Sequence, residues 1–241
     1  MNVQGAISEL APNGVLRAGI NLSNFLLVTG KDSSGAPVGV APDMARAIAD
    51  RLEVNLTLTT FSSPGELADA AGKDVWDIGL IAAEPVRAEA IAFSAAYVEI
   101  EATYMVRNDS MLGTIADVDR PGVRIAVSER SAYDLYLTRN LEHASLVRAK
   151  GLAAALDIFQ SEGLDALAGL RPGLIDDAGK LPEFRILDGR FTAVQQAVGT
   201  SVTKKIGASF MRDFVNDAKS SGLVERLIAK YGMVDRLLVA T

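Results

Sequence analysis

The sequence of 241 residues contains no cysteine and a single histidine, His143. The absence of cysteine excludes disulfides, thiol catalysis and cysteine-ligated metals, and one histidine argues against a zinc site or a histidine-dependent catalytic triad. His143 lies beside Glu142 at the end of a predicted helix, where we expect it to be exposed. The carboxylates Asp43, Asp77 and Asp165 lack the spacing of metal ligands, so no metal or other cofactor is expected.

Long apolar runs and basic clusters are missing as well. No segment approaches the roughly 20 apolar residues of a transmembrane helix. Residues 1–9 contain neither the basic nor the apolar stretch of a signal peptide, which is either absent by nature or has been removed. The 24 Lys and Arg against 30 Asp and Glu give a net charge of −6, and nucleic acid is therefore not an expected partner.

Hydrophobic residues make up 49% of the chain and charged residues 22%, which is typical of a folded protein with one large or two small domains. Short apolar segments alternate with amphipathic ones in both halves of the sequence. Strands are expected at 15–20, 56–60, 75–83, 123–127, 146–149, 164–170, 185–187 and 192–199. Helices are expected from residue 42 and at 67–71, 131–141, 152–161, 208–220 and 223–231.

This alternation predicts an α/β fold in which mostly parallel sheets are flanked by helices. Two such units, joined by extended segments near 97–106 and 192–197, indicate a two-lobed protein with a two-strand hinge. The first lobe is expected to comprise residues 1–100 plus 196–241, and the second residues 101–195. A cleft between the lobes is the default ligand site.

Two motifs in this frame suggest anion binding. Arg87 follows a predicted strand, and its planar guanidinium suits a carboxylate; the alternative is a surface arginine paired with Glu84 or Glu89. Ser131 opens the helix after another strand, where backbone N–H groups attract anions; alternatively, Ser131 is only a helix cap. Asp176-Asp177, in contrast, is interpreted as a solvated pair in a loop.

Three segments resemble the family 3 solute-binding proteins of bacterial ABC uptake transporters. They are Pro-Val-Gly-Val-Ala-Pro-Asp-Met-Ala-Arg-Ala-Ile-Ala at 37–49, Trp-Asp-Ile-Gly at 76–79, and Arg-x5-Phe-Ser-x-x-Tyr at 87–97. Weaker matches at 115–118, 164–166 and 195–199 extend the resemblance over nearly the whole chain. It implies a type II periplasmic-binding-protein fold, a small carboxylate-bearing ligand, a membrane permease as partner, a monomer and a periplasmic location.

The resemblance also implies roles for individual residues. Arg87 matches the arginine that holds the ligand carboxylate, joined by Ser131 and Ala132 from the second lobe. Asn21, Asn24 and the adjacent Phe25 fall on a loop with polar or aromatic contacts, and Phe61 matches a ring that packs on the ligand. The complete expected set is Asn21, Asn24, Phe25, Phe61, Glu84, Arg87, Ser131, Ala132, Tyr133 and Arg171.

The sequence departs from this family at two places. The loop before Arg87 is shorter than the threonine-rich loop of amino-acid binders. Leu170-Arg171 stands where those proteins carry an aspartate for the ammonium group of the ligand. An unpaired ammonium group is costly in a closed cleft, so we expect a di-acid, an aromatic acid or a similar anion to bind better than a zwitterionic amino acid. Glu84 is the one nearby residue that could take the place of the aspartate.

Two further interpretations remain open at this point. The first is an enzyme similar to the cyclohexadienyl dehydratases, with Glu84 as general acid; an acid beside Arg87 suits ion pairing better than proton donation, which favours binding. The second is a cytoplasmic sensor that couples closure around a ligand to a protein partner. This would agree with the absence of a signal peptide from the sequence.

Overall fold

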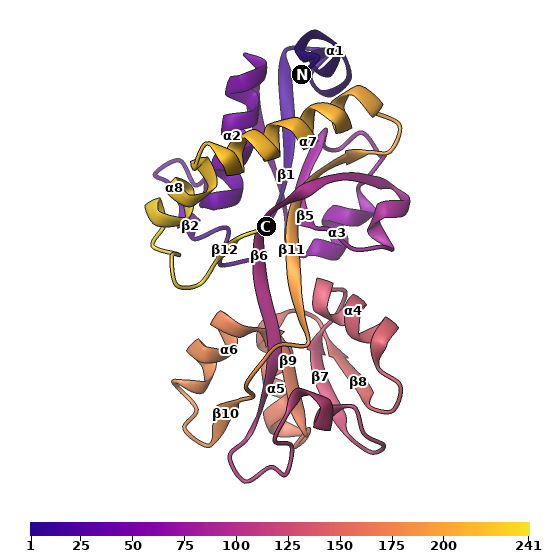
Figure 1. Cartoon of the computed structure of the whole chain (residues 1–241), viewed down its shortest axis with the longest axis vertical. Helices are drawn as coiled ribbons and strands as arrows, with labels where there is room; N and C mark the ends of the chain where they lie inside the picture. Colours follow the sequence, from indigo (N-terminus) through magenta and orange to yellow (C-terminus); the bar gives the residue numbers. More distant parts are fainter. The chain divides into compact units, whose positions relative to one another are not determined.

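The computed structural model describes residues 1–241, which form two compact units. Unit 1 comprises Met1–Glu99 and Gln195–Thr241, and unit 2 comprises Ile100–Val194. The chain passes from one unit to the other within strand β6 (Ile91–Arg107) and returns within strand β11 (Thr192–Ser201). Both units consist of strands flanked by helices, as the sequence predicts (Figure 1).

The strands of unit 1 run in the order β4-β1-β5-β11-β6. Strand β1 (Val15–Asn21) is parallel to β4 (Asn55–Phe61) over all of its residues, and on its other side to β5 (Ile78–Ala82). Strand β11 is antiparallel to β5, and β12 (Leu238–Val239) is antiparallel to β6. A separate hairpin of β2 (Gly30–Lys31) and β3 (Pro37–Val38) precedes α2 (Val40–Leu52).

The other helices of unit 1 are α1 (Val3–Leu10), α3 (Pro64–Asp69), α7 (Lys205–Ser220) and α8 (Leu223–Lys230). Helix α1 lies beside α7 (Figure 1). The two helices approach closely at Gly207, where a Cβ would lie 2.7 Å from Cδ2 of Leu10. The Glu9 carboxylate accepts a hydrogen bond of 2.8 Å from the Gly207 N–H, in the first turn of α7.

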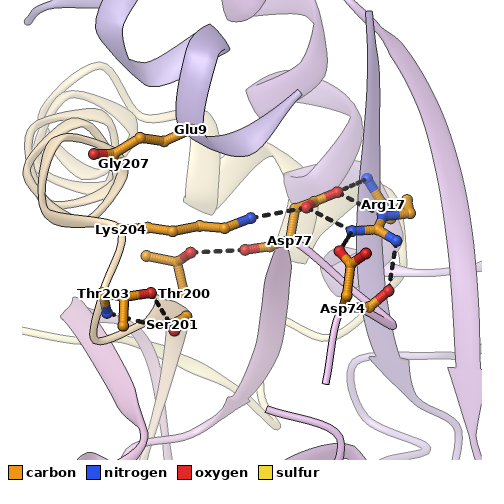
Figure 2. A network of polar contacts seen from close by, with 9 residues as sticks. All are labelled: Glu9, Arg17, Asp74, Asp77, Thr200, Ser201, Thr203, Lys204 and Gly207. Atoms are coloured by element: carbon orange, nitrogen blue, oxygen red, sulfur yellow. Dashed lines mark hydrogen bonds and ion pairs between the residues drawn. The ribbon is translucent and has the colours of Figure 1, made fainter. Parts of the chain in front are cut away.

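A buried carboxylate, Asp77, connects distant segments of unit 1 (Figure 2). Arg17 donates to both of its oxygens at 2.9 Å, and Lys204 donates to Oδ1 at 2.9 Å. The Thr200 hydroxyl donates to the Asp77 carbonyl at 2.7 Å. Burial alone would raise the pKa of Asp77, but the hydrogen bonds from Arg17 and Lys204 outweigh it and hold the pKa below its ordinary value.

In unit 2 the strand order is β6-β9-β7-β8. Strands β7 (Arg124–Ser128), β8 (Ser145–Ala149) and β9 (Ala166–Leu170) are mutually parallel, whereas β9 and β10 (Phe184–Ile186) are antiparallel to β6. The helices are α4 (Ala132–Asn140), α5 (Leu152–Ser161) and α6 (Arg171–Ala178). Phe159 of α5 packs in a core with Met105, Leu167 and Phe184.

Two helices differ from the sequence-based expectation. Helix α1 was not predicted, and Asp176-Asp177 lies in α6 and not in a loop, so that interpretation is wrong. Pro172 stands in the first turn of α6, a position where proline favours the start of a helix. None of the helices has both the length and the apolar character needed to cross a membrane.

Candidate functional site

The expected site residues of unit 1 lie where three parallel strands end. Asn21, the last residue of β1, is paired with Phe61, the last residue of β4. On the other side of β1, strand β5 ends at Ala82, and Glu84 and Arg87 follow directly. Ligands of open α/β sheets bind beyond the carboxyl ends of the strands, so these residues share the edge of unit 1 that suits a ligand.

Arg87 begins a short 3₁₀ turn, η1 (Arg87–Glu89), and its side chain is only 5% exposed. Its backbone N–H donates to the Glu84 carbonyl at 3.0 Å, and Nη1 donates to the Ala82 carbonyl at 2.8 Å. These bonds fix the guanidinium at the end of β5, and the bond to Ala82 uses one of its five N–H donors. The interpretation of Arg87 as an exposed arginine on a helix surface is therefore wrong.

The loop after β1 contains three of the expected residues. The Asn21 side-chain oxygen accepts from the backbone N–H of Ser23 at 3.1 Å and from its hydroxyl at 2.8 Å, so this side chain shapes the loop. Asn24 is buried, and its side-chain oxygen has no hydrogen-bond partner in the protein. Phe25 is exposed at the surface of the loop, and the Arg236 guanidinium lies 5.8 Å from the centre of its ring.

Phe61 packs against a hydrophobic cluster beneath α3. A Cβ on Gly19 would lie 3.4 Å from the Phe61 ring and 3.2 Å from Trp76, so a side chain larger than glycine would press on both rings. Trp76 is buried in this cluster and its indole N–H donates to the Leu67 carbonyl at 3.1 Å, so Trp76 serves as a packing residue. Phe61 itself is half-buried and forms one side of the cluster.

In unit 2, the start of helix α4 follows strand β7. The Ser131 hydroxyl accepts a hydrogen bond from the Asp134 N–H at 3.1 Å, so Ser131 is the helix cap. The N–H groups of Ala132 and Tyr133 lie in the first turn of α4, where the helix has no carbonyl for them to bond, and they form no hydrogen bond with the protein. Two such donors at the positive end of a helix attract an anion. The Tyr133 hydroxyl is buried close to the Ser131 and Ser128 side chains, and burial raises its pKa to about 12.

A buried carboxylate, Asp134, supports this helix start. It accepts hydrogen bonds from the Arg130 N–H at 2.7 Å and from Arg148 Nε at 2.9 Å. The first bond helps hold Arg130 in the left-handed region, with φ of 58°, which is unusual for a residue other than glycine. Our reading of the sequence missed Asp134 and Arg148, although an acidic residue three positions after a serine cap is a recognisable signal.

Arg171 lies at the start of α6, directly after β9. Because β9 is parallel to β7, helices α4 and α6 begin at the same edge of unit 2 (Figure 1). The Arg171 side chain donates to Glu101 at 2.8 Å and to the Gly189 carbonyl, and Glu101 also meets Arg190 at 3.5 Å. Arg171 is therefore engaged by an acid of its own unit, which the sequence did not indicate.

Each unit thus presents donors for an anion at the carboxyl ends of its parallel strands: Arg87 in unit 1 and the start of α4 in unit 2. The structure contains no group of three or more acidic or histidine side chains that could hold a metal ion. His143 is exposed, as expected, and its backbone N–H donates to Asp119 at 2.8 Å. The chemistry available at these two places is hydrogen bonding and charge pairing with a small polar molecule.

Comparison with known proteins gives one family. Residues 17–234 match the family described as "Bacterial extracellular solute-binding proteins, family 3". A search among curated proteins finds no significant match.

Solved structures agree with the predicted fold. A mutant of ArgBP from T. maritima has a TM-score of 0.75 at 23% identity, covering 94% of this chain and 99% of that one. AbpA from Streptococcus pneumoniae, bound to L-arginine, has a TM-score of 0.76 at 19% identity, covering 95% and 99%. The ancestral amino acid-binding protein AncCDT-1, a precursor of cyclohexadienyl dehydratase, has a TM-score of 0.74 at 21% identity, covering 93% and 98%. The two-lobed type II periplasmic-binding-protein fold is thereby confirmed.

Proposed function

We infer that this chain, which belongs to the bacterial extracellular solute-binding proteins of family 3, binds a small molecule that carries a carboxylate. The observation that carries this proposal is the placement of Arg87. An arginine that is 5% exposed and held to the end of β5 by the Ala82 carbonyl has a fixed orientation. A guanidinium fixed in this way loses little conformational freedom when it binds a carboxylate through paired hydrogen bonds.

The start of α4 supports the same ligand chemistry. The Ala132 and Tyr133 N–H groups are donors without acceptors, and Asp134 holds the turn that presents them. We propose that one ligand binds to Arg87 and to this helix start, and that the units close around it by bending near residues 97–102 and 192–196. This role is binding without catalysis, which agrees with the family.

The ligand is proposed to be an organic acid or an amino acid of modest size. The AbpA structure contains L-arginine, which supports a molecule of this size. In unit 2, however, β9 ends at Leu170, which has no carboxylate to pair with an ammonium group of the ligand. The next residue, Arg171, is a cation and pairs with Glu101. A ligand without an ammonium group therefore fits the proposed site better than a zwitterion.

The proposed partner is the membrane permease of an ABC transporter, to which the protein delivers its ligand outside the cytoplasm. The family description as extracellular supports this location, and one structural relative is the substrate-binding protein of an amino acid ABC transporter. Reconstitution of a candidate ABC permease in vesicles gives a direct measurement: ligand uptake into the vesicles should depend on adding this protein.

Calorimetric titration of carboxylate ligands found by a thermal-shift screen tests the binding proposal. Arg87→Ala should weaken binding about 30-fold or more, because loss of a buried charge-assisted contact costs about 2–5 kcal/mol. Arg46→Ala is the matched control, since the Arg46 side chain is largely exposed and lies on α2. The proposal fails if Arg87→Ala binds as the native protein does, or if the screen finds only uncharged sugars or polyamines.

A further inference from the structure

Strand β4 forms the outer edge of unit 1 and is paired only with β1. Its first residue, Asn55, donates its N–H to the Gly14 carbonyl at 3.0 Å, and its last, Phe61, accepts from the Leu22 N–H at 2.9 Å. In a parallel pair, alternate residues turn both backbone groups toward the partner strand. The residues of β4 that instead turn both groups outward are Leu56, Leu58 and Thr60. Their outward N–H and C=O groups form no hydrogen bond in the protein.

This edge lacks the features that normally prevent strands from pairing. Strand β4 reads Asn-Leu-Thr-Leu-Thr-Thr-Phe, without charge, proline or glycine, and its register with β1 is uninterrupted. The other outer strands differ: β8 contains Arg148, β10 contains Arg185, and β12 has two residues. An exposed, uncharged and regular edge of this length favours pairing with another strand.

An open hollow of about 460 Å³ lies along this edge. Its lining includes Leu56, Leu58 and Thr60, the same residues whose backbone groups point outward. The hairpin residues 34–37 and Arg46 form the rest of the lining. The hollow therefore leaves room over the leucine face for the side chains of an added strand.

We propose that the chain is a dimer, in contrast to the monomer expected from the sequence: β4 pairs with β4 of a second copy, antiparallel and about a two-fold axis at Leu58. In this register Leu58 faces its own counterpart, and Leu56 faces the counterpart of Thr60. Each of these facing pairs exchanges two backbone hydrogen bonds, because all of these residues turn their N–H and C=O groups outward. On the opposite face of the strand Thr57 meets the counterpart of Thr59, a favourable cross-strand pair.

Self-complementarity is the reason to choose a second copy over another protein. Reversing the strand about Leu58 places leucine against leucine or threonine, and threonine against threonine. No charge of one copy meets a like charge of the other within β4, although each chain carries a net charge of −6. The resulting contact is isologous and closes on itself, so it gives a dimer and not a filament.

Sedimentation over a concentration series tests this dimer. Leu58→Lys places two ammonium groups face to face at the two-fold axis, and should weaken dimerisation at least tenfold. Leu58→Glu should do the same, whereas an equal mixture of the two variants should form the dimer again through a Lys–Glu pair. Met111→Lys is the matched control: Met111 is 92% exposed in unit 2, and its substitution should leave dimerisation unchanged.

A cysteine crosslink gives a second measurement in this cysteine-free chain. Facing residues of a hydrogen-bonded antiparallel pair have Cα atoms about 5.5 Å apart, which a disulfide spans. Leu58→Cys should become a covalent dimer under mild oxidation with copper phenanthroline much faster than Met111→Cys. The proposal is overturned if the native chain is monomeric at every concentration, if its dimer survives Leu58→Lys, or if the two cysteine variants crosslink at equal rates.

Discussion

Replacement of Asp77 by asparagine removes the negative charge that holds Arg17 and Lys204 together (Figure 2). The Asp77 side chain is 3% exposed and accepts from both cations and from the Arg17 backbone N–H at 3.0 Å. Asparagine has nearly the same shape but offers only one acceptor oxygen, and its NH₂ group faces at least one of the same donors. The Asp77→Asn protein should therefore be folded but less stable.

The expected loss follows from the exposure of each partner. Removing one member of a buried ion pair costs about 3–5 kcal/mol. The side chains of Arg17 and Lys204 are 33% and 25% exposed, so both regain some hydration, and we expect about 2–3 kcal/mol. For a chain of this length, that corresponds to a decrease in Tm of roughly 4–12 °C.

The effect should also depend on pH. The pKa of Asp77 is lowered in the folded protein. The contribution of its charge to stability is therefore complete above the pKa that Asp77 has in the unfolded chain, about 3.9, and is lost as pH falls through the lower pKa that it has in the folded protein. The difference in stability between the native protein and Asp77→Asn should stay constant from pH 7 down to about pH 4, and then shrink.

Thermal and urea unfolding at several pH values measure this difference, with Asp74→Asn as the control. Asp74 also pairs with the Arg17 guanidinium, at 2.5 Å, but its side chain is 89% exposed. An exposed pair contributes about 0–1 kcal/mol, so this variant should lose little stability. If Asp77→Asn is no less stable than Asp74→Asn, or if their difference does not shrink in acid, burial of the Asp77 charge does not stabilise unit 1.

Three further predictions concern the other contacts described above. Glu9→Ala should lower the free energy of unfolding by about 1 kcal/mol, because the Gly207 N–H at the start of α7 loses its acceptor. Urea unfolding measures this change with Glu53→Ala as the control, and an equal loss in both variants would contradict it. Arg87→Lys should recover only part of the affinity lost in Arg87→Ala, because an ammonium group cannot donate two parallel hydrogen bonds to one carboxylate. Full recovery in calorimetry would show that charge alone is recognised. A deaminated acid should bind more tightly than the matching amino acid, and a preference of about 1.4 kcal/mol, or tenfold, for the amino acid would identify Glu84 as the ammonium partner.

Local patterns in the sequence were sufficient for most of the fold. Helix α5 was predicted at 152–161 and spans Leu152–Ser161, because its apolar residues recur at helical spacing. Strand β1 was predicted at 15–20 and spans Val15–Asn21. The positions of Arg87 and Ser131 after strands follow from the same alternation of elements, since the end of one element fixes where the next begins.

Contacts between distant residues account for what the sequence did not show. Arg171 was expected among the ligand-binding residues, and its guanidinium pairs with Glu101, 70 positions earlier in the chain. Asp77 was noted only as a carboxylate without metal spacing, and its partner Lys204 is 127 positions away. Helix periodicity and turn residues report on neighbours within a few positions, so they carry no information about such pairs.

The interruption of unit 1 by unit 2 has a consequence for the order in which the protein can fold during synthesis. Residues 100–194 are complete, as a continuous stretch, before the ribosome has made β11, α7 or α8. Until then Asp77 lacks Lys204, and α1 lacks the helix against which it packs. Unit 2 can therefore fold first, whereas the larger unit must wait for the last 47 residues, Gln195–Thr241, and its contacts close long loops that slow folding. Until those residues have been made, apolar surfaces of unit 1 stay uncovered on the nascent chain and are available to chaperones.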